Sequence, residues 1–270
     1  MTDRTAGRQA AGLVIDDQTF RDDLLAQARR RGRCRRMKGA SMTATVLDCA
    51  QAVKAIYKNT EVYRYQLVRG RYDPENSAVG TEGYSIGHYL GNGAIAGHSL
   101  VSVRGSAKGL TTKDWIDDDV SIGVGRTPDR YTEALALMLS LQRMLPREHF
   151  IIVGHPLGGH IAQMVGVMCN LPFITFNAPP ALGTWTGRLP NGVDPWNFAM
   201  GLNYRVNYDP VSKISGRHVG SLVTLRLAGK PHLKAHGAAT VINSVREEGF
   251  SMMPALRAIA NANNLPFLHN

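Results

Sequence analysis

Two wholly apolar runs, separated by one helical pattern, are the feature that most constrains the fold of this chain. The runs cover residues 150–153 and 173–176, and each has the length of a strand that is buried on both faces. A glycine-rich turn and a helical pattern over 157–169 lie between them. Strand, helix and strand in this order form a βαβ unit, which requires parallel strands. We therefore predict an α/β fold with a mostly parallel central sheet flanked by helices.

The remaining hydrophobic patterns predict further elements on both sides of this unit. Apolar residues at helical spacing predict helices, short apolar runs predict strands, and clusters of Gly, Pro, Asn and Asp predict loops. The expected helices are 44–57, 130–145 and 237–245, and the segment beyond 245 is expected to be looser. The expected strands lie within 84–105, with a turn at 91–93, and at 204–208 and 222–227, whereas 70–83 and 180–203 are expected to be loops.

The positive charge of the chain is concentrated near its N-terminus. The formal net charge is +10, and seven of the ten residues from Arg29 to Lys38 are basic. Such a cluster attracts anionic surfaces, so we predict a membrane partner for it, with a merely solvated charge run as the alternative. No aromatic residues interleave with the arginines, so base stacking has no candidate and we do not expect a nucleic-acid partner. We expect 1–40 to be a basic, partly helical and partly mobile extension, and 41–270 to be a single domain.

The cysteines and the N-terminal sequence bear on the compartment. Cys34, Cys49 and Cys169 are an odd number without CxxC spacing, which indicates free thiols in a reducing compartment rather than disulfides or a zinc site. The first twenty residues lack the apolar stretch of a signal peptide. We therefore expect a cytoplasmic protein as synthesised, and export by a signal-independent route stays open.

The histidines and acidic residues show no HExxH-like spacing, and no phosphate loop is present, so we predict neither a metal nor a cofactor.

The turn after the first apolar run carries the most specific motif. Residues 153–159 read Val-Gly-His-Pro-Leu-Gly-Gly, and they lie between a predicted strand and a predicted helix. This is the setting of the nucleophile elbow, G-x-S-x-G, in which small residues at Gly154 and Gly158 allow a sharp turn. The segment resembles the class 3 (fungal-type triacylglycerol) lipases of the α/β-hydrolase fold, which carry Gly-His-Ser-Leu-Gly-Gly here. Only Pro156, at the position of the nucleophilic serine, departs from that pattern.

Three further blocks carry the same resemblance, which extends over about residues 80–245. Residues 101–106 with 114–118, residues 207–211 and residues 236–241 are similar to the other blocks of this lipase family. The resemblance implies that Ser106 and the backbone N–H of Leu157 are oxyanion-hole donors. It also implies that Asp209 and His236 are the acidic and basic members of a catalytic triad, with His232 as an alternative base. Such a site hydrolyses carboxylic esters of lipids or phospholipids.

Pro156 alters this expectation in two ways. Proline has no hydroxyl or thiol and so cannot attack an ester. Its ring also fixes φ near about −65°, whereas the elbow nucleophile normally has a positive φ. We therefore predict a relaxed elbow, and an intact helix after it, because proline fits the first turn of a helix.

Two other serines imitate the elbow motif. Ser85 lies in Gly-Tyr-Ser-Ile-Gly, without the strand before it and the helix after it that an elbow needs. Ser99 lies in Gly-His-Ser-Leu and is predicted to be a strand residue.

Three functional hypotheses stay open: a lipid ester hydrolase, an inactive pseudo-hydrolase that binds a lipid or protein partner, and a scaffold for the basic cluster.

Overall fold

The computed structural model describes residues 43–58, 60–72, 84–105, 129–184, 189, 192–227 and 235–264. The predicted N-terminal extension, its basic cluster from Arg29 to Lys38, and Cys34 lie outside the described residues. So do Ser106, residues 114–118 and His232.

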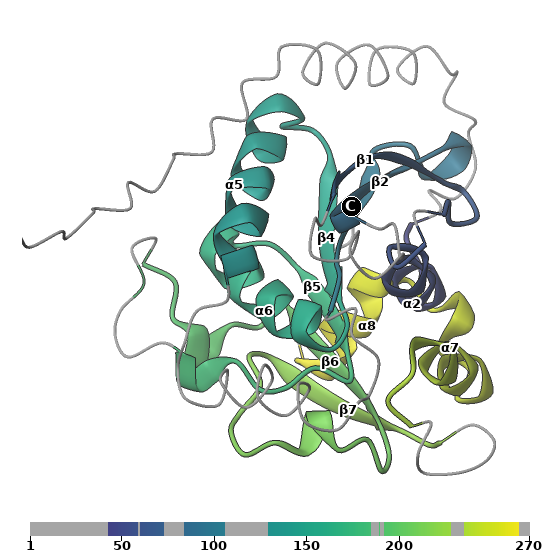
Figure 1. Cartoon of the computed structure of the whole chain (residues 1–270), viewed down its shortest axis with the longest axis vertical. Helices are drawn as coiled ribbons and strands as arrows, with labels where there is room; N and C mark the ends of the chain where they lie inside the picture. Colours follow the sequence, from purple (N-terminus) through teal and green to yellow (C-terminus); the bar gives the residue numbers. More distant parts are fainter. Residues whose placement is uncertain are drawn as a thin grey trace, which may run out of the picture.

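Within the described residues, a central sheet has seven strands, which lie side by side in sequence order (Figure 1). β1 and β2 pair antiparallel, as do β2 and β3, while all pairs from β3 to β7 are parallel. The predicted α/β fold class, with a mostly parallel central sheet, is therefore confirmed. The strands are β1 (Tyr65–Tyr72), β2 (Tyr84–Gly91), β3 (His98–Val103), β4 (His149–Gly154), β5 (Phe173–Phe176), β6 (Gly201–Val206) and β7 (Ser221–Leu225).

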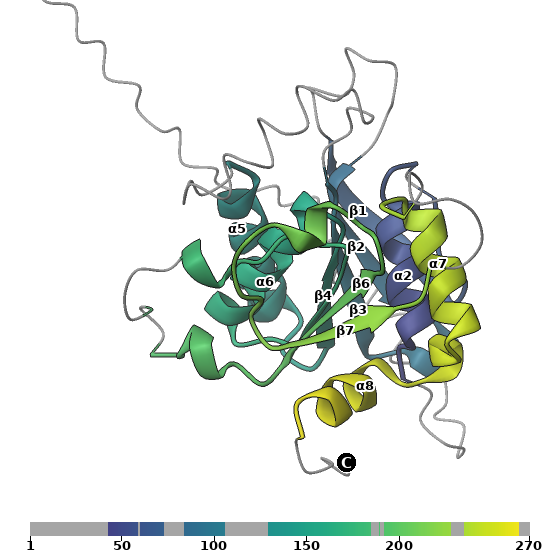
Figure 2. The ribbon, with the colours of Figure 1, turned by 90° about the horizontal axis from the view of Figure 1, so that it is seen from below.

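Helices cover both faces of this sheet (Figure 2). The α-helices in the described part of the chain are α2 (Val46–Ala55), α5 (Asp129–Met144), α6 (Leu157–Cys169), α7 (Ala238–Glu247) and α8 (Ala255–Ala262). α5 and α6 pack on one face, and α2, α7 and α8 contribute to the core on the other face. Short 3₁₀ helices are η1 (Gly93–Ile95), η2 (Leu182–Thr184), η3 (Pro195–Asn197), η4 (Val211–Lys213) and η6 (Phe250–Met252). Among the described residues, no helix combines the length and apolar character needed to cross a bilayer.

The alternation of side chains along β4 explains why its sequence is wholly apolar. Ile151 and Val153 belong to the core beneath α2 and α7, whereas Phe150 and Ile152 belong to the core beneath α5 and α6. Both faces of this strand are thus removed from water, and burial of side chains of this size contributes about 1.5–3 kcal/mol each. This two-sided burial agrees with the position of β4 in the middle of the sheet.

Some predicted elements differ from those observed. Residues 70–72, predicted as loop, are the end of β1, an edge strand whose Arg69, Gly70 and Arg71 interrupt the apolar pattern. Residues 246–264, predicted to be looser, contain the end of α7, η6 and α8. β6 begins at Gly201, within the segment 180–203 that was predicted as loop.

The first turn of α6 lies in direct contact with the backbone of the sheet. A Cβ atom at Gly158 would lie 2.0 Å from the carbonyl oxygen of Val103 in β3, and one at Gly154 would lie 2.2 Å from the carbonyl oxygen of Gly158. Only glycine fits where backbones approach this closely. The two glycines that the sequence motif singles out are therefore required for packing.

We predict that Gly158→Ala lowers the free energy of unfolding by about 3 kcal/mol or more, because the new methyl group forces α6 away from β3. Denaturant unfolding followed by circular dichroism measures this change. Gly183→Ala is the control, since a Cβ atom at Gly183 meets no atom within 4 Å. It should change the free energy of unfolding by less than about 0.5 kcal/mol. Equal effects of the two substitutions would contradict the packing argument.

Candidate active site

The turn between β4 and α6 adopts a helical rather than a strained conformation at Pro156. Its φ is −69° and its ψ is −55°, and α6 begins at the next residue. The Pro156 carbonyl accepts hydrogen bonds from the backbone N–H groups of Gly159 and His160, at 3.0 and 3.1 Å. The predictions of a relaxed elbow without positive φ and of an intact following helix are therefore confirmed.

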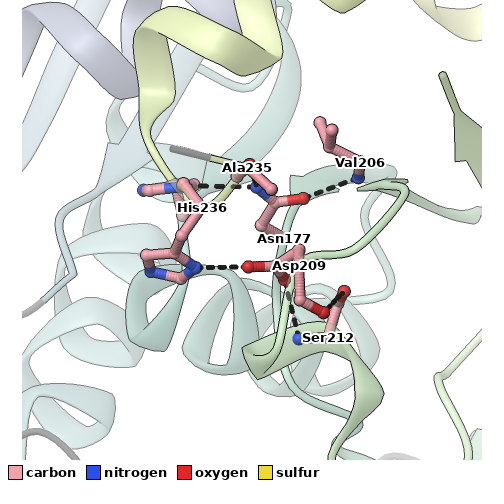
Figure 3. A network of polar contacts seen from close by, with 7 residues as sticks. Asn177, Val206, Asp209, Ser212, Ala235 and His236 are labelled. Carbon is pink, nitrogen blue, oxygen red and sulfur yellow. Dashed lines mark hydrogen bonds and ion pairs between the residues drawn. The ribbon is translucent and has the colours of Figure 1, made fainter. Parts of the chain in front are cut away.

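His236 and Asp209 form a close pair (Figure 3). Nδ1 of His236 lies 2.6 Å from Oδ1 of Asp209, although the two residues are 27 positions apart in the chain. The His236 side chain is 10% exposed and that of Asp209 is fully buried. A buried carboxylate in this position fixes the imidazole orientation and its tautomer.

Asp209 is held as a carboxylate by its partners. It follows β6, and its Oδ2 accepts a hydrogen bond from the backbone N–H of Ser212 at 2.8 Å. Burial raises the pKa of Asp209, but the hydrogen bonds from His236 and Ser212 outweigh burial and leave that pKa below its ordinary value. The group is therefore charged at neutral pH and can stabilise an imidazolium at His236.

His155, the residue before Pro156, supports His236 from the elbow. Its Nε2 lies 2.7 Å from the backbone carbonyl oxygen of His236, and the two rings are 5.1 Å apart between centroids. Because a carbonyl only accepts, Nε2 of His155 carries the proton. Burial, together with the neighbouring His236, lowers the pKa of His155 to about 3. His155 is therefore neutral at any pH at which the site would work.

Asn177 connects the two halves of the pair, and sequence reasoning missed it. Its Nδ2 donates to the carbonyl oxygens of Ala235 and His236, at 3.0 and 3.2 Å, and its Oδ1 accepts from the Val206 N–H at 2.7 Å. An asparagine directly after a buried strand was the available signal, because turn residues at the carboxyl end of parallel strands often serve a site.

The backbone around the predicted oxyanion site is held by Tyr57, which sequence reasoning also missed. The Gly105 N–H donates to the Tyr57 hydroxyl at 3.1 Å, and that hydroxyl donates to the His155 carbonyl at 3.4 Å. Leu157 is the first residue of α6, where backbone N–H groups have no acceptor within the helix. The structure thus places Leu157 at the turn, while Ser106 lies outside the described residues.

The other candidate residues lie elsewhere. Ser85 is the second residue of β2 and not part of an elbow. Ser99 is buried in β3, as predicted, and its hydroxyl donates to Glu148 at 2.7 Å. Cys49 and Cys169 are free thiols. Within the described ranges, no cluster of His, Cys, Asp or Glu side chains could hold a metal ion.

The mostly parallel sheet, its helices on both faces and the turn between β4 and α6 define an α/β-hydrolase fold. The family model described as "Phospholipase-like: Tle-like phospholipase domain" matches residues 38–245. The chain belongs to this phospholipase-like family, which places it among lipid ester hydrolases by descent. A comparison with the sequences of curated proteins finds no match.

Solved structures of fungal lipases are similar to this chain at low identity. A triacylglycerol lipase from Penicillium expansum is 14% identical, with a TM-score of 0.41, and the match covers 81% of this chain and 95% of that one. A mono- and diacylglycerol lipase from Aspergillus oryzae is also 14% identical, with a TM-score of 0.34 and coverages of 83% and 93%. Similarity this distant assigns no residue role.

The neutral, buried His155 gives a testable pH dependence. The unfolded chain takes up a proton at this residue near pH 6.5, whereas the folded protein does so only near pH 3. Acidification through this window therefore favours unfolding, by about 1.4 kcal/mol per pH unit for one such group. We predict that His155→Gln, which keeps a side-chain donor but cannot titrate, reduces the stability loss between pH 6.5 and 4.5 by about 2–3 kcal/mol.

Urea unfolding at the two pH values measures this difference. The parent chain, unfolded at the same two pH values, is the reference for this difference. An unchanged pH dependence in His155→Gln would contradict the assignment of a buried neutral imidazole.

Proposed function

We propose that this chain carries the active site of a phospholipid or other lipid ester hydrolase in which the acid–base pair is present and the covalent nucleophile is missing. The observation that supports this most directly is the 2.6 Å contact between His236 Nδ1 and buried Asp209, beside the turn between β4 and α6. The membership of the phospholipase-like family supports a lipid ester as the substrate class.

The proposed roles follow from ordinary ester hydrolysis. His236 accepts the proton of a nucleophile through Nε2 and returns it to the leaving alcohol. Asp209 holds the imidazole in the required tautomer and stabilises its positive form. The N–H of Leu157 and a donor from Ser106 stabilise the negative oxygen of the tetrahedral intermediate. His236, rather than His232, is the proposed base because of its hydrogen bond to Asp209.

Pro156 closes the acyl-enzyme route in the sequence as it stands. Proline has no hydroxyl or thiol, so no covalent intermediate forms at residue 156. The chain should therefore hydrolyse short p-nitrophenyl esters no faster than a variant that lacks both Asp209 and His236. Any residual rate above water then comes from substrate binding and the oxyanion donors alone.

The second candidate function is a non-catalytic, lipid-binding pseudo-hydrolase. Pro156 itself is the observation that favours it, because proline has no nucleophilic group and its helical φ differs from the positive φ of a nucleophile elbow.

For both candidate functions, an anionic membrane surface is the proposed partner of the basic residues from Arg29 to Lys38. Each basic residue near such a surface contributes about 1 kcal/mol to binding.

We predict that Pro156→Ser restores ester hydrolysis and covalent labelling by a fluorophosphonate. Serine supplies the hydroxyl and removes the restriction on φ, so residue 156 can adopt the strained turn at a cost of about 1–3 kcal/mol. Release of p-nitrophenol and the mass of the labelled protein measure the two effects. A folded serine variant that neither turns over esters nor reacts with the probe would favour the lipid-binding function.

Two further variants and the parent chain control this experiment. In the serine variant, His236→Ala should reduce turnover by at least about 10³-fold, since loss of the general base disables the whole triad. His232→Ala should reduce it much less. Labelling of the parent chain would contradict the proposal and would redirect attention to Ser85.

A further inference from the structure

Asn177 lies in a bend, outside the regular helices and strands. It directly follows β5, its side chain is fully buried, and its φ of 49° lies in the left-handed region. Non-glycine residues rarely adopt this conformation, and asparagine does so more readily than most. The buried amide makes three hydrogen bonds, which lead to the two members of the His236–Asp209 pair (Figure 3).

One half of the Asn177 amide fixes the segment that carries Asp209. Its Oδ1 accepts from the Val206 N–H at 2.7 Å, and the carbonyl of Val206 in turn accepts from the Asp209 N–H at 3.1 Å. The Asn177 side chain is therefore two hydrogen bonds away from the backbone of the carboxylate residue. The end of β6 and the turn after it share this anchor.

The other half of the amide fixes the segment that carries His236. Its Nδ2 donates to the carbonyls of Ala235 and His236, and the His236 carbonyl also lies 2.7 Å from Nε2 of His155. Two donors thus hold this one carbonyl, one of them from the end of β5 and one from the elbow. A carbonyl oxygen has two lone pairs, so these two donors use its full accepting capacity.

We propose that Asn177 is a positioning residue that sets the distance between His236 and Asp209 by binding the backbone of both segments through a single side chain. This inference rests on the proposed function for its catalytic consequence. The positioning of the His236–Asp209 pair does not depend on that function, and it applies to the chain with Pro156 in place. A displacement of about 1 Å at a catalytic group can reduce turnover about 100-fold, so such an anchor has a measurable effect.

The experiment compares the full-length chain with Asn177→Gly and Asn177→Asp. Glycine accepts the left-handed backbone without strain and removes both links, while an ionised aspartate keeps an acceptor for Val206 and loses the donor to His236. The readout at pH 8 is the far-downfield proton resonance of His236 Nδ1, assigned by its loss in His236→Gln. We expect the resonance to shift or broaden in both variants at matched folded fraction.

Asn170→Gly is the matched control, because Asn170 is also left-handed, with φ of 51°, but caps the far end of α6. It should leave the resonance unchanged. A resonance that stays unchanged in a folded Asn177 variant would overturn the proposal, as would failure of both variants to fold, since Asn177 would then serve the fold as a whole. If Asn177→Asp folds and Asn177→Gly does not, the His236 Nδ1 resonance of Asn177→Asp decides the outcome. A shifted or broadened resonance supports the proposal, and an unchanged one overturns it.

A second arm tests the catalytic consequence in the Pro156→Ser background. There Asn177→Gly should lower kcat by roughly 10- to 100-fold and change KM by less than about twofold, because positioning of the base acts on the chemical step. A change confined to KM would overturn the positioning role. If Pro156→Ser is itself inactive, the proposed function fails, whereas the resonance comparison still decides the role of Asn177.

Discussion

The contact between the first turn of α6 and the backbone of β3 is the constraint on which the rest of the site depends. Gly158 lies so close to the Val103 carbonyl that no side chain fits between them, and Gly154 makes a similar approach to Gly158. This contact fixes where α6 begins and therefore holds residue 156 above the carboxyl edge of the sheet. Because this contact depends on Gly154 and Gly158 and not on residue 156, the turn keeps its position with proline at 156.

The His236–Asp209 pair is built from other parts of the chain than the turn between β4 and α6. Asp209 follows β6, and His236 precedes α7, so their approach depends on the end of the sheet and on the amide of Asn177. His155 is the link between the pair and the elbow, through the carbonyl of His236. This division explains how a chain with proline at position 156 can hold a 2.6 Å contact between His236 and Asp209.

The sequence predicts those elements whose hydrophobic pattern is strong. β4, α6 and β5 were predicted closely because two-sided burial and helical periodicity both leave clear patterns. β1 was missed because polar residues interrupt this edge strand, and α8 because it is only eight residues long. Asn177 escaped notice because its role depends on three segments that meet only in the fold. The motif at 153–159, in contrast, indicated the elbow directly, since its glycines are required by local packing.

The most direct test of the central claim, that the site lacks only its nucleophile, is a crystal structure of Pro156→Ser. The account predicts that Oγ of the introduced serine lies within about 3.2 Å of His236 Nε2, the reach of a hydrogen bond between nucleophile and base. The contact between His236 and Asp209 should remain close to 2.6 Å. A serine hydroxyl that points away from His236 while residue 156 stays helical, or a His236 ring separated from Asp209, would contradict the account.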